Sequence, residues 1–193
     1  MISLTTSDAL LITDIQRDFL PGGTLAISGS ETVLPILDNY VRQFQARHLP
    51  MFMTRDWHPP DHCSFQPQGG PWPPHCVAGL PGSLPPSSFM TPPSAVIIYK
   101  AIDRDQEAYS AFHGTALDRH LRALKVRRLF IGGLATDYCV LNSVKDARIL
   151  GYDVCLLADA IKAVNLRPDD GRRAEEEMIR LGAVSVRWER PGT

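Results

Sequence analysis

Short runs of apolar residues recur along the chain, and most of them lack polar alternation. The runs that predict strands are Ala9–Thr13, Met51–Thr54, Ala95–Tyr99, Arg128–Ile131, Val154–Leu157 and Val184–Val186. Continuous apolar strands are typical of a sheet that is covered on both faces. The pattern therefore predicts six strands buried between two outer layers.

Segments with helical spacing of apolar residues lie between these runs, at Glu31–Arg47, Leu117–Leu124, Cys139–Leu150 and Asp170–Leu181. Glycine follows the last two segments, where it is suited to end a helix. The alternation of strands and helices predicts an α/β fold with a doubly wound, mainly parallel six-stranded sheet and helices on both faces. In such a sheet the reactive groups collect outside the carboxyl ends of the strands.

One segment, at about residues 57–94, interrupts this alternation. It holds 11 of the 16 prolines and three of the six histidines, and it has no helical or strand period. Its aromatic residues, Trp57, Phe65, Trp72 and Phe89, are anchors that a solvated linker would not need. We expect an ordered active-site insertion within a single domain that spans residues 1–193.

Composition and charge narrow the class of protein. The chain has 193 residues, of which 44% are hydrophobic and 21% charged, and its net charge is -1. This balance is typical of a globular protein and does not favour a nucleic-acid or membrane partner. The sequence shows neither an apolar run long enough to cross a bilayer nor an N-terminal signal peptide. We expect a cytoplasmic protein that acts on a small molecule, and its oligomeric state is left open.

Reactive side chains stand directly after four of the predicted strands. Asp14 follows the first strand, Asp56 the second and Lys100 the third, and the fourth leads through a glycine-containing turn to Cys139. At the start of a helix, the unpaired N–H groups and the helix dipole lower the pKa of a thiol. A nearby ammonium would lower it further, and a nearby carboxylate could take the proton. The four positions together predict a cysteine nucleophile.

The insertion carries a second group of candidate residues. Asp56, His58, His62 and His75 combine a carboxylate with three imidazoles, a set of ligands that suits one divalent zinc, iron or manganese ion. An alternative is a structural zinc site in which Cys63 and Cys76 join the histidines. Both readings make the insertion a metal-binding loop.

The sequence blocks around these residues resemble those of the nicotinamidases, within the isochorismatase-like cysteine hydrolases. Three motifs carry the resemblance, D-x-H-x3-H from Asp56, W-P-x-H-C from Trp72 and A-T-D-x-C-V from Ala135. The similar blocks extend over Leu10–Ile27, Thr54–Phe65, Trp72–Ser83, Tyr99–Phe112 and Gly132–Val154. The combination is far more specific than any one motif, and it covers most of the chain.

The resemblance implies an activity and a role for each candidate residue. The activity is metal-dependent hydrolysis of nicotinamide, and of pyrazinamide, to the acid and ammonia through a thioester, a step of NAD salvage. The resemblance implies Asp14 as base, Lys100 as electrostatic partner and Cys139 as nucleophile, with an oxyanion hole formed by Ala135 and Cys139 and a cis peptide before Ala135. The implied metal ligands are Asp56, His58 and His75, and His62 matches less closely. The residues implied around the substrate are Phe19, Trp72, Tyr109 and Leu134.

Two other functions stay open on the sequence alone. Another amidase of the same superfamily, of the ureidoacrylate or carbamoyl type, would share the cysteine but generally lacks the histidine-rich loop, and an isochorismatase lacks the cysteine. A non-catalytic, zinc-stabilised binding module would make Cys139 dispensable. The presence of Cys139 together with His58 and His75 favours the nicotinamidases over the other members of the superfamily.

Overall fold

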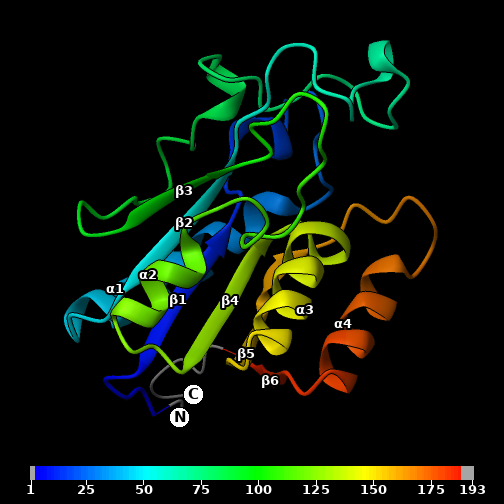
Figure 1. The fold of residues 1–193 in the computed structure, drawn as a ribbon. Coiled ribbons are helices and arrows are strands. Elements are labelled where there is room, and N and C mark those ends of the chain that lie inside the picture. The colour runs from blue at the N-terminus through cyan, green and yellow to red at the C-terminus, as the bar shows by residue number, and fades with distance from the viewer. Residues whose placement is uncertain (1–2, 188–193) are drawn as a thin grey trace.

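The computed structural model describes residues 3–187, in which six strands form one parallel sheet of order β3-β2-β1-β4-β5-β6 (Figure 1). The strands are β1 (Asp8–Thr13), β2 (Met51–Asp56), β3 (Val96–Lys100), β4 (Arg128–Leu134), β5 (Asp153–Lys162) and β6 (Val184–Val186). The parallel six-stranded sheet that the apolar runs predict is thereby confirmed. The expectation of one domain over 1–193 stays a prediction, and residues 1–2 and 188–193 lie outside the described part.

The helices cover both faces of the sheet, as expected. They are α1 (Leu34–Ala46), α2 (Leu117–Ala123), α3 (Leu141–Ile149) and α4 (Asp170–Arg180), and one π-helical turn, Thr136–Val140, precedes α3. Figure 1 shows α1 behind the sheet and the other three helices in front of it. Among residues 3–187, no helix is both long and apolar enough to cross a membrane.

Alternate residues of the central strand supply the two halves of the core. Leu10 and Ile12 of β1 point into the cluster that packs against α1, whereas Ala9 and Leu11 point into the cluster shared with α2 and α3. All six residues of β1 are buried. A strand with apolar side chains on both faces can only lie between two layers, which is why the apolar runs were informative.

Several strands extend farther than their apolar runs. β2 continues through Arg55 to Asp56, and β4 continues through two glycines to Leu134. β5 is more than twice as long as predicted because it continues to Lys162, and its last two residues, Ile161 and Lys162, pair with β4 again after an irregularity between Ile131 and Gly133. These extensions are polar or glycine-containing, so apolar character alone could not predict them.

The proline-rich insertion is ordered without long elements. It contains two short 3-10 turns, Gln66–Gln68 and Pro81–Ser83, and two isolated bridges, His58↔Val77 and Phe65↔Trp72. Of the four predicted anchors, Phe65, Trp72 and Phe89 are buried, whereas Trp57 is only partly buried. The insertion lies over the carboxyl ends of the strands (Figure 1).

Replacement of Gly133 by alanine is expected to destabilise the protein more than replacement of Gly151. Both glycines have positive φ, +114° and +90°, but a Cβ at Gly133 would collide with the backbone of Thr13, whereas Gly151 faces open space. Alanine in an incompatible backbone conformation costs more than about 1 kcal/mol, and the collision adds to this in Gly133→Ala alone. Thermal unfolding of both variants measures the difference, and equal losses would contradict the close approach of β4 to β1.

Candidate active site

The strand order brings the four predicted strand-end residues together. β3, β2, β1 and β4 are neighbours in the sheet, and their carboxyl ends carry Lys100, Asp56, Asp14 and Cys139. All four residues are buried, with at most 5% of the residue exposed. The predicted convergence at one edge of the sheet is what the structure shows.

The ammonium of Lys100 lies at the centre of this group. Its Nζ is 2.5 Å from Asp56 Oδ1, 3.1 Å from Asp14 Oδ2 and 3.4 Å from Cys139 Sγ. A fully buried charge is tolerated only where opposite charges and hydrogen bonds surround it. Burial lowers the pKa of Lys100, but the Asp14 and Asp56 carboxylates outweigh burial, so the pKa lies well above its usual value and the lysine is charged.

The two carboxylates respond to this environment in opposite directions. Burial raises the pKa of Asp14, and Lys100 offsets only part of that increase. Burial also raises the pKa of Asp56, but the Lys100 ammonium lowers it, and the pKa lies below its usual value. Asp14 is therefore the carboxylate with the greater tendency to accept a proton.

Cys139 lies within the π-helical turn Thr136–Val140. This turn begins directly after Ala135, which follows a cis peptide bond with Leu134. The cis peptide was expected. The pKa of the thiol differs from the prediction, because burial raises it well above its usual value while Lys100 lowers it only in part. The resting sulfur is therefore a thiol that needs a base, and the ligand-type atoms of Asp14 and Cys139 lie within 4.8 Å of each other.

A metal-ligating group stands beside this cluster. One ligand atom each from Asp56, His58 and His75 lie within 4.8 Å of one another, and all three residues are buried. The Nδ1 of His58 donates to the Ala101 carbonyl at 3.2 Å, and the Nδ1 of His75 donates to the Pro73 carbonyl at 2.8 Å. These bonds fix the tautomer in which Nε2 is a free ligand.

The chemistry of this group fits a divalent metal ion. The Nε2 of His58 is buried without a hydrogen-bond partner in the described structure, which is costly unless a cation binds there. Burial lowers the pKa of His75 and favours the neutral imidazole that a metal needs. Asp56 belongs to both clusters, since its Oδ1 contacts Lys100 while its Oδ2 lies 3.7 Å from His58 Nε2.

His62 lies next to this group without belonging to it. Its ring centroid is 4.3 Å from that of His58. However, its Nδ1 accepts from the backbone N–H of Ser64 at 3.3 Å, and its Nε2 lies 3.2 Å from the Gln106 carbonyl. Both ring nitrogens thus have protein partners. No metal-ligating group within residues 3–187 includes Cys63 or Cys76, which are free thiols, so the alternative structural zinc site finds no support.

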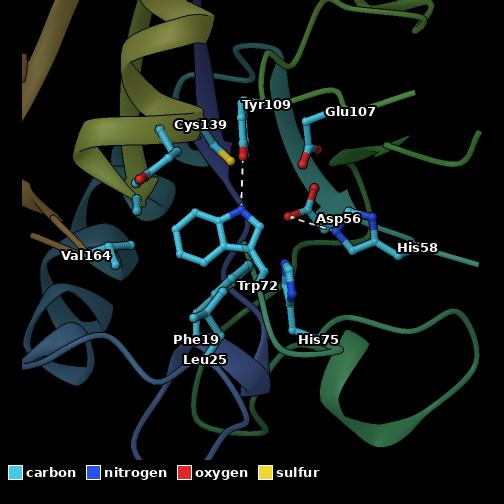
Figure 2. A pocket seen from close by; sticks show the side chains of 12 residues that line it. Phe19, Leu25, Asp56, His58, Trp72, His75, Glu107, Tyr109, Cys139 and Val164 are labelled. Carbon is cyan, nitrogen blue, oxygen red and sulfur yellow. Dashed lines mark hydrogen bonds and ion pairs between the residues drawn. The ribbon is translucent and has the colours of Figure 1, made fainter. Parts of the chain in front are cut away.

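A pocket opens between the thiol and the metal-ligating group (Figure 2). Of the residues expected around the substrate, Phe19, Trp72 and Tyr109 line it, as do Ala135 and Cys139. Trp72 Nε1 donates to the hydroxyl of Tyr109 at 3.0 Å, which fixes both rings. Leu134 is different, because its fully buried side chain belongs to the core cluster on the α1 side and does not line the pocket.

Four further residues line the pocket that were not predicted from the sequence, namely Leu25, Glu107, Tyr138 and Val164. Tyr138 adjoins Cys139 and packs edge-on against Trp72, with ring centroids 5.0 Å apart. Its position beside the nucleophile could have identified it. Leu25 and Val164 are ordinary apolar residues of loops, and no sequence pattern distinguishes them.

The comparisons with known proteins agree with this geometry. The model of the isochorismatase domain matches residues 8–189. The nicotinamidase of Escherichia coli is 33% identical over 91% of this chain and 92% of its own. Among solved structures, the pyrazinamidase of Pyrococcus horikoshii in complex with zinc is 43% identical, with a TM-score of 0.90, over 94% of this chain and 99% of its own. A protein of L. infantum in complex with nicotinate is 35% identical, with a TM-score of 0.89, over 96% of both chains.

Proposed function

This chain belongs to the isochorismatase family, and on that premise we propose that it is a nicotinamidase, which hydrolyses nicotinamide to nicotinic acid and ammonia. The observation that carries the proposal is the position of the Cys139 thiol and the Asp56–His58–His75 group on one small pocket with aromatic walls. A pyridine carboxamide matches both sites, because its carbonyl carbon can react with the thiol and its ring nitrogen can bind the metal. Pyrazinamide has both features too, which makes it a second substrate.

The first half of the reaction forms a thioester. Asp14 takes the proton of the Cys139 thiol, and its raised pKa brings it nearer to that of the thiol, as efficient proton transfer requires. The thiolate attacks the carboxamide carbon beside the Lys100 ammonium. Backbone N–H groups of Ala135 and Cys139 stabilise the oxyanion, a contribution of roughly 3 to 4 kcal/mol per donor. Asp14 then returns the proton to the departing ammonia.

The second half releases the acid. Asp14, again a carboxylate, takes a proton from water, which attacks the thioester carbon and expels the Cys139 thiolate. Asp14 then gives this proton to the sulfur, which restores the resting thiol. Lys100 stays charged throughout, because Asp56 and whichever of Asp14 and Cys139 carries the negative charge hold its pKa high. It thereby balances the negative charge that moves between Asp14 and Cys139.

Asp56, His58 and His75 would hold the metal. A zinc, iron or manganese ion held there would act as a Lewis acid toward the ring nitrogen and so orient the substrate. Phe19 and Trp72 confine the ring, and Tyr109 holds the indole in place. His62 would become a fourth ligand after rotation of its ring away from Ser64 and Gln106, which would free a nitrogen beside His58.

The test of the proposed function is release of ammonia and nicotinic acid from nicotinamide by the purified, reduced, zinc-loaded protein. Equal amounts of the two products are expected. If neither product forms while a ureidoacrylate or carbamoyl amide is hydrolysed, the chain is another amidase of its family. If no amide is hydrolysed, the non-catalytic binding module is favoured.

Benzamide is expected to be a much poorer substrate than nicotinamide. It has the same carboxamide and ring shape but lacks the ring nitrogen, and a misplacement of about 1 Å can cost roughly 10²-fold in rate. Removal of the metal by a chelator, or the substitution His75→Ala, should lower kcat/KM for nicotinamide toward the benzamide value and barely change the latter. Equal kcat/KM for the two amides in the metal-loaded enzyme would mean that the histidines serve structure alone.

A further inference from the structure

The segment that follows β1 carries three polar side chains in alternation, Asp14, Gln16 and Asp18, and the proposed chemistry uses only the first. Asp14 points to Lys100. Gln16 and Asp18 point elsewhere, and each hydrogen-bonds to the backbone of a segment that carries a metal-ligating side chain. Neither is a member of the metal-ligating groups in the described structure.

Gln16 holds the backbone of Asp56. Its Oε1 accepts from the N–H of Asp56 at 2.9 Å, and its Nε2 donates to the carbonyl of Asp56 at 2.8 Å and to that of Ser83 at 3.0 Å. The side chain is fully buried, and both donors and the acceptor of its amide are in use. Removal of this amide would leave three buried backbone groups without this partner.

The hydrogen bonds of the Gln16 side chain take the place of backbone pairing between β1 and the end of β2. β1 pairs with β2 as far as Ile12↔Met53, and the chain then leaves the sheet at Asp14, which has a φ of +50°. On its other side, Asp56 is in register with Lys100 of β3. The Gln16 amide therefore takes the place of the β1 backbone next to Asp56, so that the backbone of this ligand is held from both sides.

Asp18 holds the segment that carries His75. Its Oδ2 accepts from the N–H of Cys76 at 2.7 Å. Cys76 is buried and has a left-handed backbone, with a φ of +46°, which needs support from its surroundings. A Cβ at Gly82 would collide with the Asp18 carboxylate, so the glycine permits this approach. The carboxylate thus fastens the residue next to a ligand.

We propose that Gln16 and Asp18 are positioning residues of the metal site. Gln16 fixes the position of Asp56, and Asp18 fixes the position of His75. Together they keep the ligand atoms of the Asp56–His58–His75 group close enough to share one ion. The segment that carries the base thereby also aligns the metal with the nucleophile. The alignment of the metal with the nucleophile rests on the proposed function, whereas the test of the two residues measures metal binding itself.

The test is the affinity for zinc, measured on folded protein by competition with a chromophoric chelator. Loss of hydrogen-bonding partners behind metal ligands typically lowers affinity about 10- to 100-fold, and we expect this for Gln16→Met and Asp18→Ala. Asp18→Asn retains an oxygen acceptor for the Cys76 N–H and should recover most of the affinity. Asp38→Ala is the matched control, because Asp38 also accepts from an amide of the insertion, that of Met90 at 3.2 Å, and should leave the affinity unchanged.

A second measurement separates positioning from general support of the fold. At saturating zinc, Asp18→Ala should lower kcat/KM for nicotinamide more than for benzamide, because only nicotinamide uses the metal. A lower melting temperature with unchanged zinc affinity in Asp18→Ala, or an equal loss of affinity in Asp38→Ala, would overturn the proposal. If Gln16→Met does not fold, the Asp18→Ala and Asp18→Asn pair decides. Zinc affinities remain informative even if the wild-type protein does not hydrolyse nicotinamide, so the two proposals can fail separately.

Discussion

Cys139→Ala is expected to abolish hydrolysis of nicotinamide while the protein stays folded. The Cys139 sulfur lies 3.4 Å from Lys100 Nζ and lines the pocket, and an alanine offers no atom that can form the thioester. Loss of a nucleophile that works as a unit with its base costs on the order of 10⁶-fold in kcat. Ammonia release, together with circular dichroism to confirm folding, measures the effect.

The control for this substitution is Cys155→Ala. Cys155 is also buried, but it lies on β5 and packs in the core, so its replacement should cost only packing and leave turnover near the wild-type value. Retained turnover in Cys139→Ala, combined with substrate-dependent labelling of Cys63 or Cys76, would assign the nucleophile to the insertion instead.

Asp14→Asn is expected to lower kcat by at least the roughly 10² to 10⁴-fold typical of general acid–base catalysis. The amide has the shape of the carboxylate but cannot take the proton of Cys139, whose raised pKa makes a base necessary. A matched control is Asp8→Asn at the other end of β1. Asp8 is also buried and pairs with Arg128 at 2.7 Å, so its loss should reduce stability without reducing kcat of the folded enzyme.

The same base predicts the direction of the pH dependence. Burial raises the pKa of Asp14, and only the carboxylate form accepts a proton, so kcat/KM should fall as the pH drops through this raised pKa. The decline should therefore begin at a higher pH than for an ordinary aspartate. Full activity in Asp14→Asn, or a decline that starts only in the usual carboxyl range, would remove Asp14 from the mechanism.

Much of the fold could be predicted because the central strands are apolar on both faces. β1, with six buried residues, is the clearest case, and parallel topology then places Asp14, Asp56, Lys100 and Cys139 at one edge. The end of β5 could not be predicted, since residues 158–162 include polar side chains, and only Ile161 and Lys162 pair with β4 again after an irregularity. A local pattern carries no information on such tertiary pairing.

The candidate site was predictable in its reactive residues and not in their surroundings. The Cys139 pKa is raised because the thiol is buried, and the sequence shows only the neighbouring helix and charges, which predict a lower pKa. Gln16 was missed because its partner, the backbone of Asp56, lies 40 residues away and leaves no trace in local spacing. Leu134 was assigned to the pocket through the resemblance, but its side chain turns into the core.

The central claim is that Cys139 forms a thioester with the pyridine carboxamide held in this pocket. Its most direct test is a rapid acid quench of the zinc-loaded enzyme during its first turnover of nicotinamide, followed by peptide mass spectrometry. We expect the mass of one nicotinoyl group on the peptide that contains Cys139, labile to hydroxylamine as a thioester is. Ammonia release with no nicotinoyl group on Cys139, or with the group on another residue, would contradict the account.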